Sequence, residues 1–181
     1  MAERSSHDRV YASYMYDSPV GTAIKAFKFE DIRALSPVLS ELFNIESMHR
    51  SDADLMVPVP LHSSRLRARG YNQSEALGRF LAGRLGLEFR NDVLVRTRDT
   101  TPQTEQPSAV ARQRSLASVF EVRTGVAGSA TKNINGLRVL LVDDVFTTGS
   151  TVKSCAAALK SAGASWVGVV VLAVQPIGAL K

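Results

Sequence analysis

Short apolar runs alternate along the chain with stretches whose apolar residues recur at helical spacing. The runs at residues 55–59, 139–142 and 167–174 predict strands that are buried on both faces of a sheet. Helical spacing from Asn72 to Gly86, and again over residues 152–162, predicts helices that pack on that sheet. Asn72 is the predicted cap of the first, with Glu75 three residues on in a variant of the capping box. Shorter strands are predicted at 93–95 and, turning back at the sheet edge, at 119–122. Strands and helices in alternation favour right-handed crossovers between parallel strands. The pattern therefore predicts an α/β fold with a central parallel sheet flanked by helices.

The first fifty residues have a different pattern from the rest of the chain. Residues 10–16 include three tyrosines and are consistent with either a short strand or an extended arm. Two amphipathic helices are predicted after them, the first ending near Lys28 and the second over residues 33–45. We therefore divide one domain into a helical, hood-like segment at 1–50 and an α/β core at 51–181.

Composition places the chain among soluble globular proteins, with 45% hydrophobic and 22% charged residues. The longest apolar run, residues 166–174, is too short to span a bilayer, so we expect no membrane partner. No apolar leader with a cleavage site precedes the first helix, which predicts a cytoplasmic protein. The single cysteine, Cys155, is predicted to pack inside a helix, because one cysteine cannot form an internal disulfide.

Two adjacent carboxylates, Asp143 and Asp144, directly follow the apolar run at 139–142. A polar turn comes next, at residues 147–151, and a helix is predicted after it. Its one glycine, Gly149, is expected to take a positive φ, and without a Cβ it leaves room for a phosphate. A strand, a polar turn and a helix start form an anion site, because free backbone N–H groups and the positive helix end converge there. Acidic residues at a strand end can accept hydrogen bonds from sugar hydroxyls. The stretch therefore predicts a site for ribose 5-phosphate, the alternative being an ordinary strand–turn–helix with a capped helix start.

A second polar segment, residues 61–73, is predicted to be a loop and carries Arg65, Arg67 and Arg69 at alternate positions. Arginine suits a phosphate partner, because its planar guanidinium donates two parallel hydrogen bonds and keeps its charge. A solvated loop or contacts to nucleic acid are the alternatives, and the net charge of +5 fits nucleic acid as well. The chain has no cluster of lysines interleaved with aromatic residues. A polyphosphorylated small molecule is therefore the simpler partner.

Residues 139–151 resemble the signature of the type I phosphoribosyltransferases, which bind phosphoribosyl pyrophosphate (PRPP). More narrowly, Pro-x-Pro followed by Arg-Gly-Tyr-Asn-Gln at 69–73, and the pair Lys28-Phe29 after a short helix, resemble the ComF family. That family is a branch associated with DNA uptake in bacteria. The resemblance implies a type I phosphoribosyltransferase-like fold that binds PRPP or ribose 5-phosphate. Mg²⁺ is the implied cofactor, held through PRPP and not directly by the protein.

The resemblance also implies roles for individual residues. Asp143 and Asp144 would orient the ribose and favour the positive charge that develops at its C1. The turn would bind the 5′-phosphate through Thr147, Thr148, Gly149, Ser150 and Thr151. The pyrophosphate would be bound by a loop that contains Leu61, His62, Arg65 and Arg69. We expect no acid–base role for His62, and we favour Arg69 among the arginines.

Two further features of the resemblance concern the ends of the site. The polar segment from 96 to about 111 corresponds to a lid loop that closes over PRPP. Gln103 within it, and Arg112 and Phe120 after it, match the ComF pattern, whereas Ser115 stands where asparagine is expected. Lys28 would be able to reach the site, but a solvated lysine at a helix end is the preferred interpretation. The chain shows no counterpart of the cysteine-rich, zinc-binding front segment of many ComF-type proteins, so we expect a shortened member or one that never had it.

Three hypotheses about function follow. The first is an enzyme that transfers a phosphoribosyl group from PRPP to an unidentified acceptor and releases pyrophosphate. The second is a PRPP-sensing protein without chemistry, connected indirectly to the DNA-uptake machinery. The third is direct binding of single-stranded DNA, which predicts a steep dependence on salt. A homodimer is a further expectation, and no sequence feature identifies the acceptor.

Overall fold

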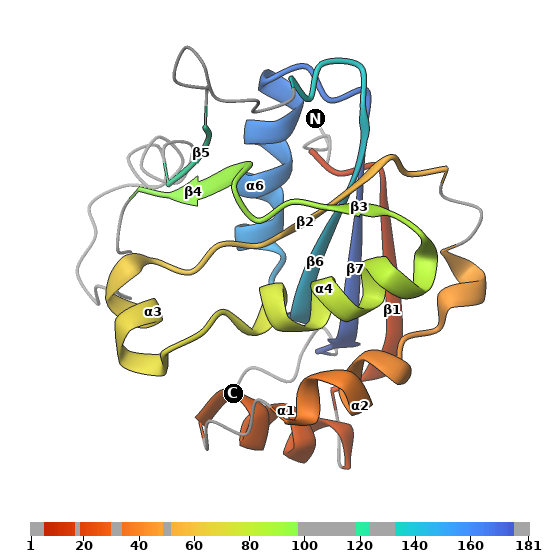
Figure 1. The fold of residues 1–181 in the computed structure, drawn as a ribbon, viewed down its shortest axis with the longest axis vertical. Coiled ribbons are helices and arrows are strands. Elements are labelled where there is room, and N and C mark those ends of the chain that lie inside the picture. Colours follow the sequence, from red (N-terminus) through yellow and green to blue (C-terminus); the bar gives the residue numbers. More distant parts are fainter. Residues whose placement is uncertain are drawn as a thin grey trace.

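The computed structural model describes residues 6–16, 19–29, 34–48, 52–97, 119–123 and 133–175. Within these ranges five strands form one sheet in which all neighbours are parallel. In spatial order they are β1 (Arg9–Met15), β7 (Trp166–Val174), β6 (Arg138–Phe146), β2 (Leu55–Pro58) and β3 (Glu88–Phe89). The predicted parallel sheet is therefore confirmed, and the long strands β6 and β7 run through the middle of the molecule (Figure 1).

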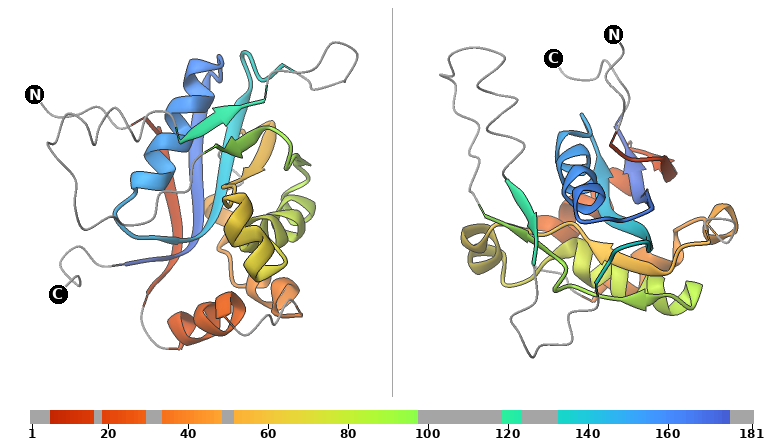
Figure 2. Two further views of the ribbon diagram at one scale, coloured as in Figure 1. Left: turned by 90° about the vertical axis from the view of Figure 1, so that its left-hand side faces the viewer. Right: turned by 90° about the horizontal axis from the view of Figure 1, so that it is seen from above.

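Helices cover both faces of this sheet (Figure 2). One face packs on α6 (Ser150–Ser161) through Val139 and Leu141 of β6. The other face packs on α1 (Val20–Phe29), α2 (Leu35–Glu41) and α4 (Gln73–Leu85) through Leu140 and Val142. Successive residues of β6 thus enter opposite cores, which explains why its sequence is continuously apolar. Cys155 of α6 is fully buried in the first of these cores, as its position in the sequence predicted.

The helix α4 lies unusually close to the sheet. A Cβ on Gly78 would lie 2.6 Å from Cγ1 of Val142 and 2.9 Å from the Phe89 ring. A larger residue would force the buried Val142 side chain or the Phe89 ring to shift, so glycine allows this close packing. This contact holds the middle of α4 against the end of β6.

Several elements differ from the predictions. The segment at 61–73 is not wholly a loop, because α3 (Ser63–Arg69) forms within it. The helix predicted over 33–45 is shorter, and a 3₁₀ turn, η1 (Ile45–Ser47), follows it. The short strands β4 (Leu94–Arg96) and β5 (Phe120–Val122) pair antiparallel in a separate two-stranded sheet. The strand β3 was not predicted, since two residues are too few to show a periodic pattern.

The predicted division at residue 50 cuts across the central sheet. Residues 10–16 were interpreted as a strand or an arm, and they form most of β1, an edge strand that pairs with β7 along its length. The hood-like segment therefore contributes one strand to the α/β core, and only its helices lie outside the sheet (Figure 1).

None of the helices in the described part of the chain is both long enough and apolar enough to cross a bilayer.

Candidate functional site

The two acidic residues are held on β6 beyond the end of its neighbour β2. The pairing of β2 with β6 ends at Pro58 and Val142, where the backbone N–H of Val59 donates to the carbonyl of Val142. Asp143 and Asp144 come next on β6, whose other edge stays paired with β7. The strand continues to Phe146, so both acids lie within the last residues of β6 and not in the loop that follows it. This open edge gives their carboxylates access to a pocket.

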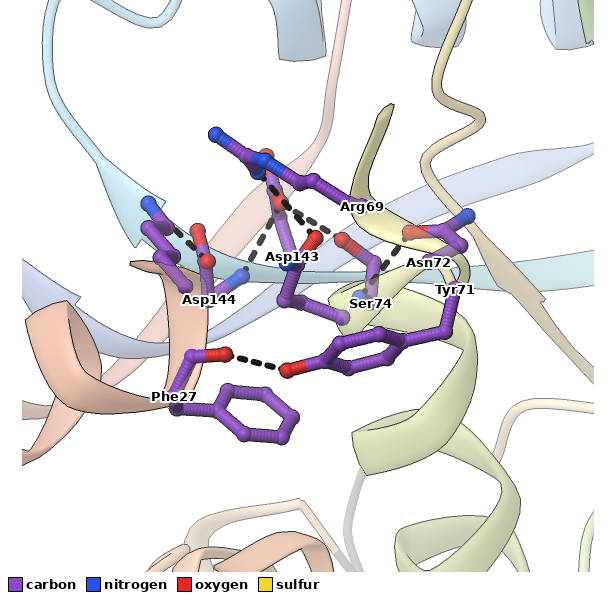
Figure 3. A network of polar contacts seen from close by, with 9 residues as sticks. Phe27, Arg69, Tyr71, Asn72, Ser74, Asp143 and Asp144 are labelled. Atoms are coloured by element: carbon purple, nitrogen blue, oxygen red, sulfur yellow. Dashed lines mark hydrogen bonds and ion pairs between the residues drawn. The ribbon is translucent and has the colours of Figure 1, made fainter. Parts of the chain in front are cut away.

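Asp143 accepts two short hydrogen bonds through Oδ1. The hydroxyl of Ser74 donates at 2.8 Å, and the backbone N–H of Asp144 donates at 2.9 Å (Figure 3). Burial and the neighbouring carboxylate of Asp144 together raise the pKa of Asp143 to about 7. The two hydrogen bonds and the charge of Lys28 oppose this rise. Asp143 therefore exchanges a proton near neutral pH.

Asp144 is the more buried of the two acids and forms an ion pair with Lys28. The exposed fraction of Asp144 is 6%, and its Oδ2 lies 2.9 Å from Nζ of Lys28, which is the end of a half-buried side chain. The preferred prediction for Lys28 was a solvated residue, and it was wrong. The helix α1 places this lysine at the site, although Asp144 is far away in the sequence.

Two contacts fix α1 and α4 around the acids. The hydroxyl of Tyr71 donates to the backbone carbonyl of Phe27, and the two rings meet edge to face with centroids 5.5 Å apart (Figure 3). Asn72 caps α4 as predicted: its side chain accepts from the N–H of Ser74 and donates to the carbonyl of Val59. The end of β2, the start of α4 and the end of α1 are thus tied together.

The predicted capping box at the start of α4 does not form. Glu75 accepts from Arg79 and Asn91 and does not return to the N–H of Asn72. Side-chain capping at this helix start therefore comes from Asn72, which accepts from the N–H of Ser74.

Helical spacing on α3 separates the three arginines. Arg65 and Arg69, four residues apart, both line the pocket, whereas Arg67 between them is exposed and does not. Their neighbour His62 was predicted to bind pyrophosphate, but it is the N-cap of α3. Its Nδ1 accepts from the N–H of Ser64 at 3.3 Å, and it is absent from the described lining of the pocket. Leu61 does line the pocket.

In the turn at 147–151, as on α3, only some of the predicted residues line the pocket. Thr147 and Thr151 line the pocket, whereas the other three residues shape the turn. The hydroxyls of Thr148 and Ser150 lie 2.5 Å apart, and Gly149 starts α6 with φ of 74°. The predicted positive φ is confirmed, but a Cβ there would meet the ring of Phe146 at 2.6 Å. Glycine is therefore required by the packing of the turn, and not only by the approach of a ligand.

Both acids, Lys28, two arginines of α3 and two threonines of the turn line one pocket of about 360 Å³. Arg96, at the end of β4, was not predicted as a site residue, and its guanidinium lies over the Phe120 ring, 5.5 Å from the centroid. No sequence signal distinguished it from the other arginines near the lid segment. Four basic side chains therefore face two acidic ones. The full lining is Tyr16, Lys28, Val59, Pro60, Leu61, Arg65, Arg69, Gln73, Ser74, Arg96, Asp143, Asp144, Val145, Thr147, Thr151 and Gln175.

The predicted lid residues Gln103 and Arg112 lie outside the described residues. No group of three or more histidine, cysteine or carboxylate side chains with metal-binding geometry occurs in the ranges that the structure describes.

Comparison with known proteins identifies the class to which this fold and pocket belong. Residues 72–181 match the model of the phosphoribosyl transferase domain. The chain therefore belongs to the phosphoribosyltransferase family, and its fold is of the α/β type I kind.

Its relatives define the branch. The chain is 34% identical over 160 residues to the DNA utilization protein YhgH of Escherichia coli O157:H7, an alignment that covers 85% of this chain and 66% of that protein. It is 29% identical over 170 residues to competence protein F of Haemophilus influenzae, covering 90% of this chain and 71% of that protein. It is 26% identical over 156 residues to competence protein ComFC of Bacillus subtilis, covering 83% and 57%. The chain is thus a ComF-family, phosphoribosyltransferase-like protein, and it spans about two thirds of the length of YhgH.

Proposed function

We propose that the pocket binds PRPP and that the protein transfers its phosphoribosyl group to an acceptor, with release of pyrophosphate. The observation that carries this proposal is the convergence of three segments on one pocket. Asp143 and Asp144 supply acceptors for a sugar diol, Thr147 and Thr151 lie at the start of α6, and Arg65 and Arg69 supply positive charge. The combination fits a sugar that carries phosphate at one end and pyrophosphate at the other.

In the proposed reaction, the bond between C1 of the ribose and the pyrophosphate oxygen breaks, and the electron pair leaves with pyrophosphate. A bond forms between C1 and the nucleophilic atom of the acceptor, which loses its proton. The basic side chains of the pocket would stabilise the leaving group, and the two carboxylates would stabilise positive charge at C1. With a pKa of about 7, Asp143 can also hold the proton that the acceptor releases.

The residues present fit a magnesium ion carried by the substrate. Carboxylate oxygens of Asp143 and Asp144 face the pocket beside the proposed diol, and oxygen is the ligand that Mg²⁺ prefers. When bound with PRPP, Mg²⁺ would neutralise charge on the departing pyrophosphate. The protein would contribute acceptors for waters around the ion, not a complete set of ligands.

A second function, PRPP sensing without chemistry, is favoured by one specific contact. The ion pair of Lys28 with Asp144 already occupies one of the acceptors that a bound diol would use. A diol that competes for Oδ2 of Asp144 would release Lys28, and this would connect the state of the pocket with the end of α1. The relatives are named DNA utilization protein and competence protein, and these names support a link between the proposed sensing and DNA uptake or use.

The decisive experiment is calorimetry with PRPP and Mg²⁺, followed by an assay of pyrophosphate release with a panel of nucleobases and amines. We expect PRPP binding in the wild type and none in the double variant Asp143→Asn, Asp144→Asn, with an unchanged circular dichroism spectrum. Unchanged affinity in the double variant would refute the proposed site. Binding without pyrophosphate release from any acceptor would favour the sensor.

A further inference from the structure

Gln73, the first residue of α4, combines burial with an unused hydrogen-bond donor. Its exposed fraction is 2%, and it lines the pocket. Its Oε1 accepts from Nη1 of Arg69 at 3.2 Å. Its Nε2 is buried and has no hydrogen-bond partner among the residues that the structure describes. A buried amide donor without a partner destabilises the folded state, so it needs an explanation, and a bound ligand that supplies the acceptor is one.

The orientation of this amide follows from the chemistry of its neighbour. A guanidinium can only donate hydrogen bonds, so the amide atom that faces Arg69 must be the oxygen. The amide nitrogen is therefore the atom left over, and it requires an acceptor. Gln73 is also at the positive N-terminal end of a helix of 13 residues, which favours an anionic acceptor.

The surroundings indicate which anion this is. Gln73 is bonded to Arg69, which shares a face of α3 with Arg65 and belongs to the basic side of the pocket. The hydroxyl of the next residue, Ser74, donates to Asp143 and so belongs to the acidic side of the pocket. Gln73 therefore belongs to the side of the pocket that carries the arginines, where a phosphate oxygen is the acceptor that the chemistry favours.

We infer that Gln73 and Arg69 act as one unit that binds the pyrophosphate group of the ligand. An incoming pyrophosphate draws the Arg69 guanidinium away from Oε1, and this movement frees the buried amide to turn and donate Nε2 to a phosphate oxygen. Gln73 thus gives the pocket a preference for a ligand with pyrophosphate over one without it. This inference rests on the proposed function and adds the residue that selects for the leaving group.

The test uses the full chain, with Mg²⁺ and three probes: PRPP, inorganic pyrophosphate and ribose 5-phosphate. The variant Gln73→Glu keeps Oε1 for Arg69 and has nearly the same shape, but it places an anionic acceptor where the donor was. We expect it to weaken PRPP and pyrophosphate binding by about tenfold or more and to leave ribose 5-phosphate binding unchanged. Arg67→Ala, on the same helix α3 but away from the pocket, is the matched control and should change none of the three affinities.

A double-mutant cycle with Arg69→Ala and Gln73→Ala tests whether the two residues act together. We expect the loss of pyrophosphate affinity in the double variant to be smaller than the product of the two single losses, because either change alone disables the unit. Independent losses would refute the coupling. Equal weakening of all three probes by Gln73→Glu would place its contact on the ribose or its 5′-phosphate and overturn the assignment, as would no weakening at all.

The outcomes also separate this inference from the proposed function. Wild-type protein that binds pyrophosphate in a Gln73-dependent manner but not PRPP would uphold the subsite and refute the proposed substrate. Wild-type protein that binds PRPP without any dependence on Gln73 would uphold the substrate and refute the subsite. Binding of neither probe by the wild type would refute both.

Discussion

Neutralising Asp143 should make the protein more stable at alkaline pH relative to the wild type. The variant Asp143→Asn is well suited to this test, because an Asn Oδ1 can accept the same hydrogen bonds from Ser74 and from the N–H of Asp144. The folded state raises the pKa of Asp143 from 3.8 to about 7, so the folded protein holds this proton more tightly than the unfolded chain. The stabilisation from the proton is therefore complete below pH 3.8 and is lost as the pH rises through 7.

The size of the effect follows from the two pKa values. One pKa unit corresponds to about 1.36 kcal/mol. From pH 5 to about pH 7 the folded protein keeps the proton on Asp143 while the unfolded chain has lost it, so about two such units of stability are lost before pH 8. The free energy of unfolding of Asp143→Asn, minus that of the wild type, should thus increase by about 2–3 kcal/mol over this interval. Comparing the two proteins at each pH cancels the titration of all other groups that the substitution leaves unchanged.

Urea unfolding followed by circular dichroism at pH 5 and pH 8 measures this difference. The variant Glu46→Gln, at an exposed position in η1, controls for the loss of a negative charge as such. A difference between Asp143→Asn and the wild type that stays constant from pH 5 to pH 8 would show that Asp143 is ionised throughout. It would then serve only as a charge and could not hold an acceptor proton.

Other substitutions test the remaining contacts. Gly149→Ala should lower the free energy of unfolding by about 1–3 kcal/mol in thermal denaturation, because it adds strain at positive φ and a clash with Phe146; unchanged stability would contradict the described turn. Lys28→Met should leave the buried Asp144 without its partner and lower stability by about 2 kcal/mol, with 1 M salt reducing the loss; no loss at low salt would argue against the ion pair. Asn72→Ala should cost about 1 kcal/mol in urea unfolding through loss of the α4 cap, and a neutral result would mean that the cap is replaced by solvent.

The sequence was most informative where local pattern and packing agree. The continuous apolar run before Asp143 predicted a strand buried on both faces, and β6 alternates between two cores. The predicted cap at Asn72 and the positive φ at Gly149 are also local features, and both are present. In each case the residue's own chemistry determines the backbone around it.

Features that depend on tertiary contact were not predictable in this way. The helix α3 has no buried residues, so it lacks the apolar stripe from which a helix is recognised. A lysine at the end of a short helix, such as Lys28, has the same local pattern whether it faces solvent or a carboxylate. The short strand β4 likewise gave no indication that Arg96 would reach the pocket. The local sequence around a charged residue does not show which residue it will pair with, because the partner is brought near only by the fold.

The direction of β1 has a practical consequence. This strand enters the sheet at Arg9, beside the start of β7, and leaves it at Met15 near the pocket, where its neighbour Tyr16 is part of the lining. A strand of seven residues spans about 23 Å, at roughly 3.3 Å per residue. An affinity tag or fluorescent reporter joined ahead of Arg9 would therefore emerge on the far side of the molecule. Immobilising the protein by that end should leave the pocket mouth open to the medium, so surface-based binding measurements can be made without rearranging the chain.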